Sequence, residues 1–174
     1  MRKLILALLI LLLYINASAQ KSRLQELQDQ LANHPQQDTF RVNRLAEIAQ
    51  SREMSTAGRV SAAEEALLLS RKLDYKVGES QALIALSQTK DIAAAIDLIK
   101  QALTVAEKSG NNKQISRVLS LFGLSLASTE QKELALHYLL NGVAVAQSAN
   151  DNSQLAFAQQ SLSQYYGIFH ADYV

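Results

Sequence analysis

Three histidines are the residues of this chain that could hold a metal ion or move a proton. They stand at His34, His137 and His170, so 103 and 33 residues separate them along the chain. A helix brings two imidazoles onto one metal ion when the histidines are three or four residues apart, and no such pair occurs. We therefore expect the three histidines to face solvent, and we expect no metal site.

The carboxylates and hydroxyls also lack the spacing that catalysis needs. Glu64 and Glu65 are adjacent, so on a helix they point away from each other and form a solvated flank rather than an acid–base pair. No G-x-S-x-G, H-E-x-x-H, Walker or dinucleotide-binding motif occurs, and the absence of cysteine excludes thiolate zinc sites and a cysteine nucleophile. We expect no catalytic residue, no cofactor and no enzymatic activity.

Composition points to helices and away from nucleic acid. One proline and six glycines in 174 residues, of which 48% are hydrophobic, favour helices joined by short turns in one domain. The formal charge is +1, and it becomes −1 without Arg2 and Lys3. Since no face is enriched in basic residues, the chain lacks the charge pattern of a nucleic-acid-binding protein.

The N-terminus has the three parts of a secretory signal peptide. Arg2 and Lys3 are followed by an apolar run over residues 4–15 and by small residues at Ala17 and Ala19. The run is shorter than the roughly 20 residues that a membrane-spanning helix needs. We expect cleavage after Ala19, a signal peptide over 1–19, and a mature domain over 20–174 that is periplasmic or secreted and not membrane-bound.

A ten-residue string recurs three times in the mature chain. The copies begin at Ala66, Ala102 and Gly142, which are 36 and 40 residues apart, and they end in Asp-Tyr, Gly-Asn and Asn-Asp. Self-similarity at such a period is typical of stacked repeats, in which each unit buries its apolar face only against its neighbours.

The elements that carry these strings are all expected to be helices. Pro35 ends the first, Asp38 or Thr39 caps the second, and Ser55 or Thr56 starts the third. Apolar residues at helical spacing predict helices over about 22–33, 40–49, 55–73, 77–89, 91–109 and 113–127, then one through 135–146 and one from 153 onward.

The spacing in the second half of the chain resembles the tetratricopeptide repeat. Twelve residues separate Gly123 from Ala135, four separate Ala135 from Leu139, and three separate Leu139 from Gly142. These are the intervals of that motif, although leucine stands where it has aromatic residues. The resemblance covers about residues 24–174 and implies an all-α, right-handed α-solenoid of stacked antiparallel helix pairs. The 40-residue period is similar to the variant found in periplasmic sensor regions of bacterial histidine kinases and related signalling proteins.

In that family the first helices of successive pairs line a concave, peptide-binding groove. Carrying the groove positions over nominates nine residues: Gln81, Ile84, Gln88, Arg117, Ser120, Leu124, Phe157, Gln160 and Gln164. The frequent glutamines suit either solubility or contacts to a peptide backbone. Ser120 and Leu124 replace two members of the Lys/Asn clamp with which some family members grip a terminal carboxylate, so we do not expect that mode of binding.

The last repeat is expected to be incomplete. A 40-residue shift places the counterpart of Ala135 one position beyond Val174, and Ala171-Asp-Tyr173 resembles the turn that opens a second helix. An unpaired last helix would expose an apolar face along Leu155, Leu162 and Tyr166 and promote self-association. Tyr165 and Tyr166 suit either a binding patch or the core, and Tyr166 falls on a core position of the motif.

Two functions follow from this resemblance. The first is an exported scaffold that binds a protein or peptide partner through its concave face, without catalysis. The second is the sensory, ligand-binding region of a two-component histidine kinase or transcriptional signalling protein, truncated before its output domain.

Overall fold

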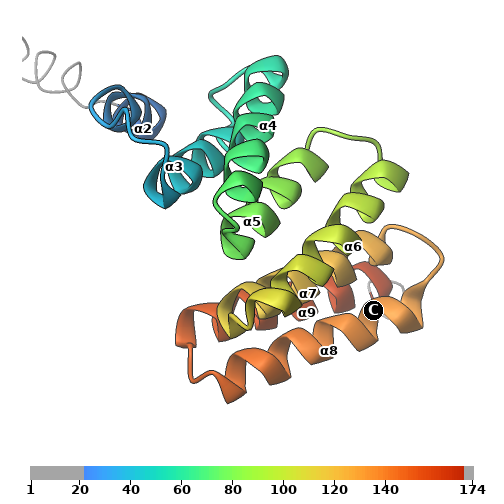
Figure 1. Cartoon of the computed structure of the whole chain (residues 1–174). Helices are drawn as coiled ribbons and strands as arrows, with labels where there is room; N and C mark the ends of the chain where they lie inside the picture. Colours follow the sequence, from blue (N-terminus) through green and yellow to red (C-terminus); the bar gives the residue numbers. More distant parts are fainter. Residues whose placement is uncertain (1–21, 171–174) are drawn as a thin grey trace, which may run out of the picture.

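The computed structural model describes residues 22–170, and this part of the chain is all-α. Its eight helices follow one another through short turns (Figure 1). They are α2 (Arg23–Ala32), α3 (Thr39–Ala49), α4 (Thr56–Lys72), α5 (Lys76–Ser87), α6 (Ile92–Ser109), α7 (Asn112–Ala127), α8 (Lys132–Ser148) and α9 (Asn152–His170). The helices predicted from apolar spacing are thus confirmed, and the predicted ends lie within three residues of the observed ones. The predicted signal peptide and the Ala171–Tyr173 turn lie outside the described residues.

Short polar side chains cap the N-termini of several of these helices, and the sequence predicts two of these caps. The side chains of Asp38 and Ser55 accept hydrogen bonds from the backbone N–H groups of Arg41 and Gly58 in the first turns of α3 and α4. Such a bond satisfies one of the N–H groups that have no partner within the helix.

The recurring strings end where the chain takes up the left-handed conformation. Asp74, Gly110 and Asn150 follow α4, α6 and α8 with φ angles of 51°, 65° and 53°. Aspartate, glycine and asparagine are the residues that adopt this conformation most readily, and it is the usual way for a helix to end. The last residues of each string therefore turn the chain into the next helix.

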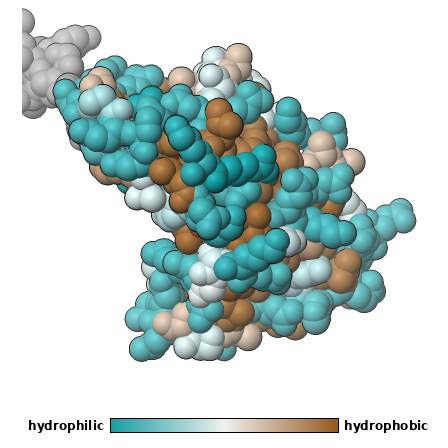
Figure 2. Space-filling model, viewed as in Figure 1, coloured by the Kyte–Doolittle hydropathy of each residue, from teal (hydrophilic) through white to brown (hydrophobic). Residues whose placement is uncertain are grey.

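Helix α5 joins two apolar clusters. Ala82, Ala85 and Leu86 belong to a cluster built from α2 to α5, whereas Leu83 and Ile84 belong to one that extends from α5 to α9. Because both sides of α5 are covered, nearly all of its residues from Gly78 onward are buried. Hydrophilic side chains cover most of the face seen in Figure 2, with apolar residues showing between them.

Serines at corresponding positions of two repeats form hydrogen bonds to the neighbouring helix. The Ser80 hydroxyl of α5 donates to the carbonyl of Ala102 in α6 at 3.0 Å. The Ser116 hydroxyl of α7 donates to the carbonyl of Gly142 in α8 at 2.8 Å. Ala102 and Gly142 begin two of the recurring strings, so this contact is part of what repeats.

Helix α9 packs differently from the prediction. Leu162 lies against the larger cluster, and Tyr165 is the buried tyrosine, its hydroxyl donating to the Lys132 carbonyl at 3.1 Å. Tyr166 is 41% exposed, so its predicted core position is wrong. The large exposed apolar residues of this helix are Tyr166 and Ile168 rather than a stripe that includes Leu162.

Within residues 22–170, no helix has the length and apolar character needed to cross a membrane.

The Asp38 cap predicts a pH dependence of stability. The backbone N–H of Arg41 and the ring of His34 hydrogen-bond its carboxylate and hold its pKa below the ordinary 3.8. A lowered carboxyl pKa stabilises the fold above the unfolded-state pKa, and this contribution is lost as the pH falls through the folded-state value. Asparagine also caps helices but does not titrate here. As the pH is lowered below about 4, we expect the free energy of unfolding, measured with urea, to fall less for Asp38→Asn than for the wild type. An equal fall in the two proteins would contradict this.

Candidate binding pocket

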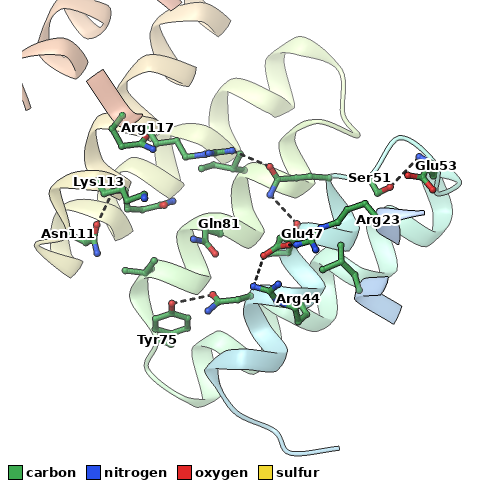
Figure 3. Close-up of a pocket in the computed structure, with 18 residues that line it drawn as sticks. Arg23, Arg44, Glu47, Ser51, Glu53, Tyr75, Gln81, Asn111, Lys113 and Arg117 are labelled. Carbon is green, nitrogen blue, oxygen red and sulfur yellow. Dashed lines mark hydrogen bonds and ion pairs between the residues drawn. The ribbon is translucent and has the colours of Figure 1, made fainter. Parts of the chain in front are cut away.

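A pocket of about 580 Å³ lies where helices α5 and α7 are separated from each other. Helices α3 and α5 pack directly, as do α7 and α9, but α5 and α7 make few contacts. The lining comes from α2, α3, α5, α7 and α9 and from the turns beside them (Figure 3). It consists of Arg23, Leu27, Asn43, Arg44, Ala46, Glu47, Gln50, Ser51, Glu53, Tyr75, Val77, Gln81, Ile84, Asn111, Lys113, Gln114, Arg117 and Gln154.

The same helical face of alternate helices forms much of this lining. Helix α3 and its C-terminal cap contribute residues 43, 47 and 50, and α5 contributes residues 77, 81 and 84, each 34 positions later. A further shift of 36 leads to residues 113 and 117 of α7. Positions four and three apart share one face of a helix. The pocket is therefore formed by one repeated face of α3, α5 and α7.

Three of the nine groove residues nominated from sequence line this pocket. They are Gln81, Ile84 and Arg117. Phe157 lies beside the lining, with the Arg117 guanidinium 5.5 Å from the centre of its ring. Gln160 and Gln164 are exposed on α9 outside the lining.

The other three nominated residues lie elsewhere. Gln88 is exposed beyond the end of α5, where its side-chain oxygen accepts from Arg59 at 3.2 Å. Leu124 packs against the larger apolar cluster. Ser120 has no exposed surface, because α8 covers it: a Cβ atom at Gly142 would lie 2.7 Å from its hydroxyl. The expectation that Ser120 faces a groove is thus wrong, since it faces the partner helix.

Arg117 is the most unusual charged group of the pocket. Its guanidinium is half-buried and donates to the Gln50 side chain at 3.4 Å, which is a long hydrogen bond across the pocket (Figure 3). Burial lowers the pKa of Arg117 below its ordinary value, because the charged form loses hydration. No acidic side chain among residues 22–170 forms an ion pair with it.

The remaining charges divide into two groups. Glu47 accepts from Arg23 at 2.8 Å and from Arg44 at 2.7 Å, so the two arginines on that wall share one carboxylate. Lys113, on the same face as Arg117 and one turn before it, lies 3.8 Å from the Asp151 carboxylate and is 61% exposed. So loose and exposed an ion pair contributes little stability.

Two buried polar atoms in the lining have no hydrogen-bond partner. They are the side-chain oxygen of Gln154 and Nε of Arg44. Gln154 is only 5% exposed. Gln114 stands 40 positions earlier, and its side-chain amide does have a partner, because it donates to the Ser80 hydroxyl at 3.1 Å. A buried amide without a partner costs free energy unless a ligand supplies one.

Sequence reasoning nominated no pocket residue from α2 or α3. The groove positions predicted from the resemblance lie only on or beside α5, α7 and α9. A backward shift of 34 from Val77, Gln81 and Ile84 would have found Asn43, Glu47 and Gln50. Arg23 and Leu27 lie outside the repeats, and no repeat shift could have found them.

His34 and His137 do not contribute to this pocket. His34 Nε2 lies 2.8 Å from the Asp38 carboxylate, so it is paired rather than simply solvated as predicted, and exposed His137 contacts the Asn141 amide at 3.0 Å. In the described part of the chain, no three His, Asp or Glu side chains lie close enough together to hold a metal ion.

Comparison with known proteins finds no match, either to a protein-family model or to a curated protein sequence.

Proposed function

We propose that this chain is an exported scaffold of the tetratricopeptide type that binds a protein or peptide segment in the pocket between α3, α5 and α7, and that it has no catalytic activity. The observation that carries the proposal is the lining itself. The same face of the three alternate helices α3, α5 and α7 contributes side chains to one pocket, at intervals of 34 and 36 residues.

The contacts between helices support a repeat stack of helix pairs. Each helix from α3 onward packs against the next, and α3, α5, α7 and α9 also contact one another in order. Within the described residues, the backbones of α4, α6 and α8 do not approach one another as closely, which is what stacked pairs with an inner and an outer row would show. The inner row is the one that lines the pocket.

The pocket has the size and composition of a ligand site. Its volume of about 580 Å³ falls within the range of roughly 300–1,000 Å³ that is common for such sites. Val77, Ile84 and Leu27 supply apolar surface, while Gln81, Gln114 and Gln154 supply amides. Amides beside an apolar wall suit the backbone and side chains of a peptide.

Filling the pocket should abolish binding. We would select octapeptides from a random library displayed on phage, in which the C-terminus of each peptide is fused to the coat protein. Gln81→Trp places an indole in the pocket, whereas Gln101→Trp makes the same change on the exposed side of α6. We expect selected peptides to bind the wild type and Gln101→Trp but to lose at least about tenfold in affinity for Gln81→Trp, because the indole occupies their site.

Circular dichroism would show that both variants remain helical. Failure to enrich any peptide over an empty surface would refute the proposed function. Equal binding to the two variants would place the ligand outside the pocket.

A further inference from the structure

Arg117 carries a charge that the described part of the chain does not neutralise. Moving a guanidinium out of water costs free energy unless an anion or strong acceptors replace the lost hydration. The contacts that the structure shows are a neutral amide at 3.4 Å and the ring of Phe157 at 5.5 Å. An anionic ligand would therefore gain more from this group than from an arginine that already has a carboxylate.

The geometry around Arg117 suits a carboxylate. The guanidinium carbon of Arg117 lies 5.5 Å from the centre of the Phe157 ring, and the planar guanidinium offers two parallel N–H groups that match the two oxygens of a carboxylate. The Gln50 contact is long and uncharged, so a ligand can displace it at small cost.

The charge of the lining is also unlike that of the chain as a whole. Residues 22–170 contain fourteen basic and fifteen acidic residues, whereas the lining contains four basic residues and two acidic ones. The Glu47 carboxylate already forms ion pairs with Arg23 and Arg44. The cations left for a ligand are Lys113 and Arg117, one helical turn apart on α7.

The Gln154 amide distinguishes a peptide from a simple carboxylate. Its oxygen is buried, has no partner and can accept a hydrogen bond, which a carboxylate ion cannot donate. A peptide backbone N–H can donate one. The pocket thus combines cations for acidic side chains with an acceptor for a peptide backbone.

We propose that the ligand of this pocket is an acidic peptide segment, in which one side-chain carboxylate binds Arg117, a second binds Lys113, and a backbone N–H donates to Gln154. This inference rests on the proposed peptide-binding function and names the chemistry of its ligand.

The test is the sequence of the peptides that the phage selection recovers. Since each displayed peptide is fused through its C-terminus, only side-chain carboxylates can supply the anion. We expect Asp and Glu to be enriched over the input library with wild-type protein and with Lys100→Gln, which removes one exposed positive charge of α6 away from the pocket. With Arg117→Gln the enrichment should disappear, and acidic peptides should bind on the order of ten- to a hundredfold more weakly.

Arg117→Lys separates a structural role from the proposed one. It keeps the charge but loses the paired N–H groups, so binding should be intermediate between Arg117→Gln and the wild type. Peptides that bind in the pocket without acidic enrichment would overturn this inference and leave the proposed function standing. The same enrichment with Arg117→Gln would overturn it too. Selection of no peptide at all would refute both.

Discussion

The Leu139→Ala variant is expected to lose about 3–4 kcal/mol of unfolding free energy. Leu139 has no exposed surface and lies at the centre of the contact between α7 and α8. Truncating it removes apolar contacts and leaves a cavity that two helices packed on rigid neighbours cannot close. Urea unfolding followed by circular dichroism measures the loss.

Leu140→Ala is the matched control for this change. Leu140 is the next residue of α8 and is 48% exposed, so the same substitution should alter stability by less than about 0.5 kcal/mol. Losses of similar size in the two variants would mean that α8 does not pack on α7 through Leu139.

Gly123→Val is expected to cost about 3 kcal/mol, for the opposite reason. A Cβ atom at Gly123 would lie 2.6 Å from Cγ of Leu139 and 2.8 Å from the backbone oxygen of Ala135. The backbone of α8 cannot move away without disturbing the Ser116–Gly142 hydrogen bond and the packing behind it. Thermal and urea unfolding would both report the loss.

Gly167→Val provides the control, because nothing lies within 4 Å of a Cβ atom at Gly167. There the substitution should be neutral or slightly stabilising, since valine has a somewhat better helix propensity than glycine. A double-mutant cycle sharpens the test. Leu139→Ala should make Gly123→Val less costly by about 1 kcal/mol or more, because one of the two clashing groups is gone. Strict additivity would contradict a direct contact between these residues.

The helices of this protein could be predicted from its sequence because the interactions that form them are local. Asp38 and Ser55 cap helices through backbone groups three residues away. The left-handed residues Asp74, Gly110 and Asn150 end helices through their own backbone preference. The predicted helices accordingly appear with ends shifted by no more than three residues.

The pocket could be predicted only in part. Gln81, Ile84 and Arg117 were nominated from the repeat register, and they line the pocket because residues of equivalent register share a helical face. Ser120 was nominated by the same argument, yet it is buried against Gly142. The direction in which a side chain at the edge of that face points depends on how closely the neighbouring helix approaches.

Helix α9 illustrates the same limit. Tyr165 and Tyr166 are adjacent, and their identity gives no reason to choose between them. Tyr165 is the one that is buried, because the rotation of α9 against α8 brings its hydroxyl to the Lys132 carbonyl.

The helices, their ends and the repeated face follow from interactions within four residues along the chain, and so they can be predicted from local sequence. The separation of α5 and α7, the hydrogen bond from Arg117 to Gln50 without a carboxylate nearby, and the wall formed by α2 and α3 depend instead on how the helices pack. These features depend on the angles at which helices pack. Those angles are set jointly by side chains from several helices, such as Leu139 and Gly123, which sequence periodicity does not bring together.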